Sequence, residues 1–152
     1  MIVIGADTHT KTHTLVAVLA ATGELIAEIT VPAKEAGYRR LAEWAHGLEG
    51  ERVFAIEDCR HVSGSLERFL LARGERVVRV APKHMAGARR SVRERGKSDP
   101  IDALAIARAA LQEGIDTLPA AWLDAEAMEI KLIADHREDL VAERTRTQNR
   151  LR

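Results

Sequence analysis

Arg52-Val53-Phe54-Ala55-Ile56-Glu57 is the stretch that decides the fold. Its four central residues are all apolar, which is typical of a strand that is buried on both faces near the middle of a parallel sheet. The stretch ends in Glu57, so a carboxylate is expected at the carboxyl end of a central strand. Functional sites in such sheets gather at this end of the strands.

Further strands are predicted on both sides of this stretch. Upstream, apolar runs over residues 2–7, 13–21 and 25–31 are separated by short turns and predict an antiparallel meander. The first of these runs ends in Asp7, whose carboxylate would lie beside Glu57 if the two strands are neighbours. Downstream, Arg76-Val77-Val78-Arg79-Val80 predicts a fifth strand.

Helical periodicity separates the later strands. Tyr38, Leu41 and Ala45 have the spacing of one helix face, and a second helix is predicted before Gly74. Three antiparallel strands followed by strand, helix and strand units predict an α/β fold, with a mixed five-stranded sheet of the ribonuclease H type and flanking helices.

Composition excludes several classes of protein. The chain has 152 residues, of which 30% are charged, and no apolar run approaches the ~18 residues that a membrane span needs. Its amino terminus lacks the basic lead of a signal peptide. The single cysteine, Cys59, excludes an internal disulfide and favours a reducing cytoplasm.

Lys97-Ser98-Asp99-Pro100-Ile101-Asp102-Ala103 places two acids three residues apart at the start of a helix. Residues at this spacing share one helix face, where two negative charges repel unless a cation lies between them. A purely structural interpretation is that Asp99 is an N-cap, Pro100 is the first helical residue and Asp102 favours the helix dipole. The two strand-end acids favour a metal site instead.

A basic block leads into this acidic pair. Residues 83–97 carry six basic side chains and one acidic one, whereas residues 98–135 carry two basic and eight acidic ones, within a net charge of zero. A polyanion next to a metal ion would explain this arrangement, and a solvated basic segment is the alternative. The basic residues are Lys83, Arg89, Arg90, Arg93, Arg95 and Lys97.

The carboxyl-terminal part is predicted to be helical. A short helix over residues 83–92 and a loop over 93–98 precede an Ala-rich helix over 99–113, which Gly114 ends. From residue 124 one long helix carries a heptad-like apolar seam, interrupted by Arg137 and Arg144. Because it runs uncapped to Arg152, we expect the natural protein to continue. The apolar residues of this seam are Ile130, Ile133, Leu140 and Leu151.

Four motifs together resemble the amino-terminal half of the DEDD insertion-sequence transposases, a family of bridge-RNA-guided DNA recombinases. They are Gly5-Ala6-Asp7 with its Thr/His/Lys-rich turn, Ala55-Ile56-Glu57, the stretch from Lys97 to Ala103, and the Arg-rich stretch from His136 to Leu151. The resemblance implies a RuvC-like catalytic domain over residues 1–114, a linker over 115–123 and the start of a coiled-coil segment over 124–152. It also implies a second, serine-bearing domain that this chain lacks.

The resemblance also implies a site. Asp7, Glu57, Asp99 and Asp102 match the tetrad of the family, which implies catalytic acids that bind Mg²⁺ or Mn²⁺. DNA and a guide RNA are the implied partners, together with a second copy of the chain, paired through the carboxyl-terminal helix. The fragment alone is not expected to recombine DNA. Beyond the basic block, the residues expected to contact phosphates are Lys11, Arg144, Arg146 and Arg150.

The ligand preferences of Mg²⁺ support a metal site independently of the family resemblance. Mg²⁺ prefers oxygen ligands and keeps several waters, so a few carboxylates suffice, and converging acids without metal would repel. Asp58 competes with Glu57, because strand alternation points the two side chains in opposite directions. His9 and His13 flank the first turn, where surface positions are expected, although either could contact phosphate or metal.

Two other functions remain open from the residues. Gly5-x-Asp7 with a polar hairpin also resembles the phosphate-binding hairpin of actin-like ATPases and sugar kinases, although that loop usually contains glycine and residues 8–12 have none. The other is a non-catalytic nucleic-acid-binding module that dimerises through residues 124–152. Metal and nucleotide titrations would separate the three.

Overall fold

The structure, a computed structural model, describes residues 1–57, 60–82, 98–122 and 125–150. The chain forms two compact units, Met1–Trp122 and Leu123–Arg152. The division therefore falls at the carboxyl end of the segment expected to be a linker, and residues 115–122 belong to the first unit.

The first unit is built on a mixed five-stranded sheet with the strand order β3-β2-β1-β4-β5. Neighbours β1, β2 and β3 pair antiparallel, whereas β4 pairs parallel with both β1 and β5. The five predicted strands and the meander are thus confirmed. Their bounds are β1 Ile2–Thr8, β2 Thr12–Leu19, β3 Leu25–Pro32, β4 Arg52–Glu57 and β5 Arg76–Val80.

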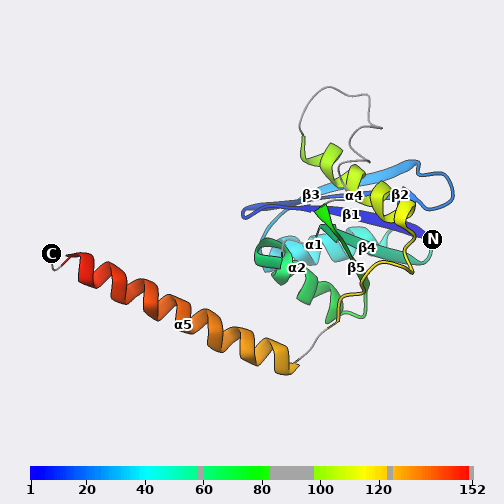
Figure 1. Cartoon of the computed structure of the whole chain (residues 1–152). Coiled ribbons are helices and arrows are strands. Elements are labelled where there is room, and N and C mark those ends of the chain that lie inside the picture. The colour runs from blue at the N-terminus through cyan, green and yellow to red at the C-terminus, as the bar shows by residue number, and fades with distance from the viewer. Residues whose placement is uncertain (58–59, 83–97, 123–124, 151–152) are drawn as a thin grey trace. The chain divides into compact units, whose positions relative to one another are not determined.

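Among the described residues, three helices cover the two faces of the sheet (Figure 1). Helices α1 (Glu35–His46) and α2 (Arg60–Leu71) lie on one face, and α4 (Asp99–Glu113) lies on the other. Successive side chains of a strand point to opposite faces, so the apolar stretches of the central strands contribute side chains to two separate cores. The core on the α4 face contains Val3 and Val53, and the opposite core contains Ile4 and Phe54.

Helix α4 lies unusually close to β1, because a glycine faces it. A Cβ atom built on Gly5 would lie 2.1 Å from the carbonyl oxygen of Ala103 and 2.5 Å from the backbone nitrogen of Ala107. No side chain fits in that space, and the two facing residues of α4 are alanines. At this point α4 therefore packs on β1 with backbone against backbone.

The start of α4 differs from the structural interpretation of its sequence. Ser98, with the extended backbone angles φ −142° and ψ 146°, occupies the N-cap position, and Asp99 is already helical. The expectation that Asp99 is the N-cap is therefore wrong. The helix begins one residue earlier than expected, so Asp99 is its first residue and Pro100 its second. The carboxylate of Asp99 is one position away from the cap. The predicted helix over 83–92 and nearly all of the loop over 93–98 lie outside the described residues.

The segment after α4 covers one edge of the sheet. The backbone nitrogen of Arg79 donates to the oxygen of Pro119 at 2.9 Å, and that of Ala121 donates to Val77 at 2.9 Å. An isolated antiparallel bridge joins Val78 to Ala120. The segment expected to be a linker thus satisfies backbone groups of the edge strand β5, which would otherwise be open to pairing with another chain.

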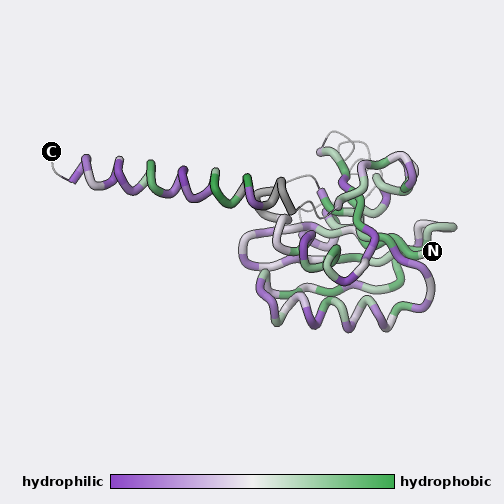
Figure 2. The backbone as a smooth tube through the Cα atoms, turned by 90° about the horizontal axis from the view of Figure 1, so that it is seen from below, coloured by the Kyte–Doolittle hydropathy of each residue, from purple (hydrophilic) through white to green (hydrophobic). Residues whose placement is uncertain are grey.

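The second unit is the helix α5 (Ala125–Arg150). Figure 2 shows polar and apolar positions alternating along it, and a single helix cannot cover its own apolar side chains. Ile130, Ile133 and Leu140 of the predicted seam are 62%, 71% and 54% exposed. Within the described part of the chain, we find no helix that is both long enough and apolar enough to span a membrane.

Candidate metal centre

The site is organised around Asp7, near the carboxyl end of β1. Strand alternation points its side chain to the same face as Gly5, the face that α4 covers. The carboxylate is only 10% exposed. On β2, the partner of Asp7 is Thr14, whose hydroxyl forms a hydrogen bond of 2.9 Å with Thr30 on β3. Asp7 is therefore held in a regular part of the sheet.

His9 continues the alternation beyond the end of β1 and shares the face of Asp7. The hairpin closes through the His9 backbone nitrogen, which donates to the oxygen of Thr12 at 3.0 Å. The Nε2 atom of His9 lies 3.1 Å from Oδ2 of Asp7 and 3.5 Å from Oδ1 of Asp99. The imidazole thus bridges the end of β1 and the start of α4.

The two acids of α4 approach Asp7 from the helix side. Asp99 is half exposed, and Asp102 is partly buried one turn further along the helix. Burial raises the pKa of Asp7; the nearby His9 opposes this shift, and the negative charges of Asp102 and Asp99 reinforce it. The three carboxylates are thus near enough to repel one another, as the sequence predicted for converging acids.

Glu57 ends β4 on the same side of the sheet. The parallel pairing of β1 with β4 runs from Ile2 and Arg52 to Ala6 and Ile56, so Asp7 and Glu57 each follow the last pair. Alternation from Val53 and Ala55 points Glu57 to the α4 face, which favours it over Asp58 as the acid of this site. Asp58 itself lies outside the described residues.

The donor atoms fit a divalent cation. Ligand atoms of Asp7, His9 and Asp99 all lie within 4.8 Å of one another, whereas Asp102 and Glu57 lie outside this tightest group. Carboxylate oxygens are the usual ligands of Mg²⁺ and Mn²⁺, and an imidazole nitrogen is also a common metal ligand. A cation at this position would offset both the burial and the carboxylate repulsion that raise the pKa of Asp7.

The structure separates the two histidines of the hairpin. His13, expected at the surface, is completely buried on the opposite face, where its ring stacks on Tyr38 with centroids 5.6 Å apart. Its Nε2 atom lies 3.3 Å from the Tyr38 hydroxyl, which in turn forms a hydrogen bond of 2.9 Å with Ser65. Burial lowers the pKa of His13, and the nearby His9 adds to this effect. His13 is thus a core residue.

Of the residues expected to contact nucleic acid, four lie in the described part of the chain and six lie outside it. Lys11 is exposed in the β1–β2 turn, close in sequence to His9, and Arg144, Arg146 and Arg150 are exposed on α5. The basic block lies outside the described residues, and its members are Lys83, Arg89, Arg90, Arg93, Arg95 and Lys97.

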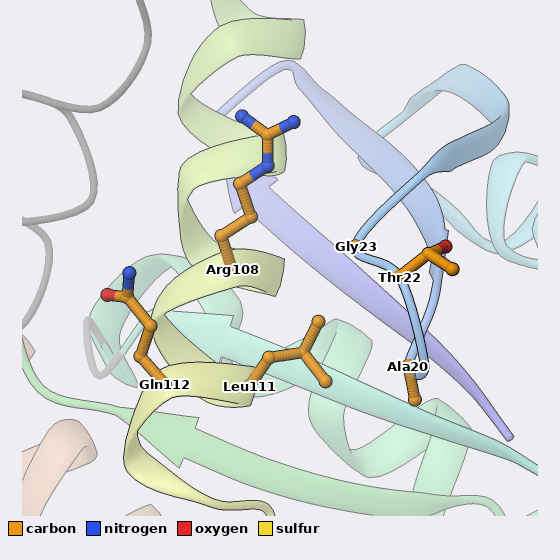
Figure 3. A pocket seen from close by; sticks show the side chains of 6 residues that line it. All are labelled: Ala20, Thr22, Gly23, Arg108, Leu111 and Gln112. Atoms are coloured by element: carbon orange, nitrogen blue, oxygen red, sulfur yellow. The ribbon is translucent and has the colours of Figure 1, made fainter.

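A pocket of about 500 Å³ lies between α4 and the β2–β3 turn (Figure 3). Arg108 and Gln112 line it from the helix, and Thr22 and Gly23 line it from the turn. The turn follows Leu19, which pairs with Ile2 at the opposite end of β1 from Asp7, about 17 Å away at the rise of a strand. The pocket is therefore separate from the acidic cluster.

Comparison with known proteins identifies the family. The sequence matches the family of the IS110 DEDD transposases over residues 4–152. The chain belongs to this family. The resemblance seen in the four sequence motifs is confirmed, and the match favours a transposase domain over the actin-like ATP-binding alternative.

A curated relative of this IS110-family chain is an uncharacterised 44.8 kDa protein of insertion element IS116 from Streptomyces clavuligerus. The two are 32% identical over 149 residues, which is 98% of this chain and 37% of the relative. The IS110-family chain therefore spans little more than a third of the length of that relative.

Solved structures show that this IS110-family domain has the RuvC-like, ribonuclease H-like fold. T. thermophilus RuvC in complex with a Holliday junction substrate has a TM-score of 0.60 and 18% identity, covering 80% of this chain and 99% of RuvC. The Holliday junction resolvase of fowlpox virus has a TM-score of 0.56 and 10% identity, covering 74% and 99%. The predicted fold class is thereby confirmed.

Proposed function

We propose that the first unit is the metal-dependent catalytic domain of an insertion-sequence transposase that acts on DNA phosphodiesters. The observation that carries this proposal is the convergence of Asp7 from β1 with the start of α4, where the Nε2 atom of His9 lies 3.1 Å from Asp7 and 3.5 Å from Asp99. Burial raises the pKa of the Asp7 carboxyl, and the negative charges of Asp102 and Asp99 add to this rise. Repelling carboxylates cost stability, and a fold that keeps them together favours a bound cation.

Asp7, Glu57, Asp99 and Asp102 would hold Mg²⁺ or Mn²⁺ in this domain. A bound divalent ion supplies charge stabilisation at the phosphodiester and activates an attacking oxygen. The chain contributes the placement of its acids. Asp7 is fixed by the sheet, the two α4 acids are fixed by the backbone packing of α4 on Gly5, and Glu57 ends the neighbouring strand.

DNA and a guide RNA are the proposed nucleic-acid partners. Membership of the IS110 family supports both, and the structurally similar proteins of T. thermophilus and fowlpox virus are a RuvC bound to a Holliday junction and a Holliday junction resolvase. The exposed Arg144, Arg146 and Arg150 of α5 provide positive charge for phosphates. Changing these three to Ala should weaken the binding of unrelated sequences equally, because phosphate contacts do not read bases.

Pairing of two chains through α5 is the second part of this proposal. Ile130, Ile133 and Leu140 follow a heptad-like spacing and are all more than half exposed. An exposed apolar seam of this kind is stabilised by burial against another helix. Arg137 and Arg144 interrupt the seam, so we expect a weak dimer whose population depends on concentration.

Calorimetric titration with MgCl₂ tests the metal site directly. The intact chain should bind Mg²⁺ with measurable heat, and Asp102→Asn should bind it far more weakly. Asp139→Asn, the same chemical change on exposed α5, is the matched control and should bind like the wild type. Equal binding by wild type and Asp102→Asn would contradict the assignment.

Fluorescence anisotropy with labelled DNA, with and without Mg²⁺, tests the function. A branched junction and a linear duplex of the same composition are compared, because the domain is proposed to act on DNA. Binding that strengthens with Mg²⁺ in the wild type, but not in Asp102→Asn, supports action at a phosphodiester. Absence of DNA binding at low salt would refute the proposal.

A further inference from the structure

We propose that His9 is a ligand of the metal ion, through its Nε2 atom, so that the centre is a mixed nitrogen and oxygen site. This inference rests on the proposed function, which places a divalent ion between Asp7 and the start of α4. The family tetrad consists of four acids, and none of its positions assigns a role to the histidine of the β1–β2 hairpin.

The first support is geometric. Ligands at neighbouring corners of an octahedral ion, each ~2.1 Å from it, are about 3 Å from one another. The Nε2 atom of His9 is 3.1 Å from the nearer carboxylate oxygen of Asp7 and 3.5 Å from that of Asp99. The imidazole nitrogen therefore already lies where a third ligand of the same ion would lie.

The second support is how the hairpin holds the imidazole. His9 is two residues beyond Asp7, so strand alternation places the two side chains on one face. Its backbone nitrogen closes the turn by donating to the oxygen of Thr12 at 3.0 Å. After β3, the backbone nitrogen of Ala33 donates to the oxygen of Lys11 at 2.8 Å, which ties the tip of the hairpin to the rest of the sheet. The half-exposed ring thus extends from a braced turn.

The third support is the balance of charges around the ring. Its nitrogen contacts two carboxylates that repel each other, and the imidazole is the one side chain in the tightest donor group that is not acidic. A neutral imidazole can donate an electron pair to a metal without adding to the negative charge of the site. A fourth acid at this position would increase the repulsion.

An imidazole ligand changes which metal the site prefers. Mg²⁺ is suited to carboxylate and water ligands, whereas imidazole favours first-row transition ions. The affinity for Mn²⁺ relative to Mg²⁺ should therefore be higher than the acids alone would give. Replacing even a residue that only hydrogen-bonds to a metal ligand lowers metal affinity by about tenfold or more. Removing His9 should therefore lower the affinity for Mn²⁺ by at least about tenfold and the affinity for Mg²⁺ by less.

The test is pulsed electron paramagnetic resonance of the intact, tag-free chain loaded with Mn²⁺. Electron spin-echo modulation detects a directly bound ¹⁴N nucleus and requires no catalytic activity. The wild type should show ¹⁴N modulation, and His9→Ala should lose it while still binding Mn²⁺. His46→Ala removes another exposed histidine, 3.7 Å from Glu75, and should keep the modulation.

The outcomes separate this inference from the proposed function. Mn²⁺ that binds the wild type without ¹⁴N modulation, or with modulation that persists in His9→Ala, overturns the role of His9 and leaves the metal site standing. No bound Mn²⁺ in the wild type overturns both. The wild-type spectrum alone decides the outcome without modulation, and Mn²⁺ binding by His9→Ala shows that the variant is folded for the comparison.

Discussion

Asp7→Asn should stabilise the metal-free protein and abolish its response to metal. The Asp7 carboxylate is only 10% exposed, and burial together with Asp102 and Asp99 raises its pKa above the ordinary value. The folded chain therefore binds the proton more tightly than the unfolded chain does. It follows that the free energy of unfolding decreases as the pH rises from about 4 through the raised pKa.

The sign and the scale of the effect follow from this linkage. A raised pKa in the folded state means that the charged carboxylate opposes folding, so removing the charge should raise the free energy of unfolding at pH 7.5. For a unit of this size, each 1 kcal/mol gained corresponds to a rise in Tm of about 4 °C. Asparagine keeps the size of the side chain and an oxygen that still accepts from His9 Nε2, 3.1 Å away. The gain should fade towards pH 4, where the wild-type carboxyl is protonated.

Metal should stabilise the wild type and leave Asp7→Asn nearly unchanged. An ion at 100 times its Kd stabilises the wild type by about 2.7 kcal/mol, or about 10 °C in Tm. Asp7→Asn should melt at nearly the same temperature in chelator and in MnCl₂. The combination is diagnostic, because an aspartate with a purely structural role would destabilise the fold when replaced, with or without metal.

The assay is thermal unfolding followed by circular dichroism, in chelator and in saturating Mg²⁺ or Mn²⁺, at pH 5 and pH 7.5. Asp139→Asn on exposed α5 controls for the loss of one negative charge elsewhere. A wild type whose Tm does not change with metal would refute the reasoning. A metal-free Asp7→Asn that melts below the wild type at pH 7.5 would also refute it, since the carboxylate would then be stabilising.

Three further predictions follow from the packing. His13 is buried with a lowered pKa, so its contribution to stability is present above about pH 6.5 and is lost as the pH falls through the folded pKa; the decrease in Tm between pH 6.5 and 5 should be smaller in His13→Phe. Gly5→Ala should cost about 1–3 kcal/mol by overpacking and weaken metal binding, measured by urea unfolding and calorimetry, whereas Gly64→Ala in α2, where a Cβ meets only a flexible arginine end, should do neither. Removing residues 123–152 should leave a monomer with an intact metal response; sedimentation showing that the full chain is also monomeric at high micromolar concentration would contradict dimerisation through α5.

The strands were predictable because their signals are local. The sequence predicts β4 and β5 with the bounds that the structure has, since β4 is an apolar run between Arg52 and Glu57 and β5 is a short Val-rich run closed by Ala81-Pro82. Helix α4 likewise ends at Glu113, before Gly114, which has the positive φ of 87° that glycine adopts readily. Its placement over β1 required a further fact, that Gly5 and two alanines leave room for it.

The positions of the acids at the ends of strands were predictable from the sequence, and the exposure of the two histidines was not. A carboxylate at the end of an apolar strand can be recognised from the sequence alone, as Asp7 and Glu57 show. The exposure of His9 and His13 depends on register, because Thr8 pairs with His13 and strand alternation then sends His13 to the opposite core. The signal for His9 was its spacing of two from Asp7, which places both on one face once the strand is known to continue.

The edge formed by residues 115–122 could not be predicted in this way. Pro119 and the absence of hydrophobic periodicity predict a connecting segment rather than a helix or a strand. Its backbone nevertheless pairs with β5, because an edge strand offers unpaired groups to whichever segment passes it. Such pairing depends on where the chain runs after α4, which no local pattern contains.

The backbone contact at Gly5 has a consequence for how this domain can change during evolution. The separation between Asp7 and the acids of α4 is fixed where main chain meets main chain, with Ala103 and Ala107 on the other side. Residues in the rest of the core can drift in size and shape, and the spacing of the acids is preserved. Positions 5, 103 and 107 can only drift together, because enlarging any one of them displaces the helix that carries half of the site. Redesign of the core for stability should therefore leave these three positions unchanged and treat the others as free.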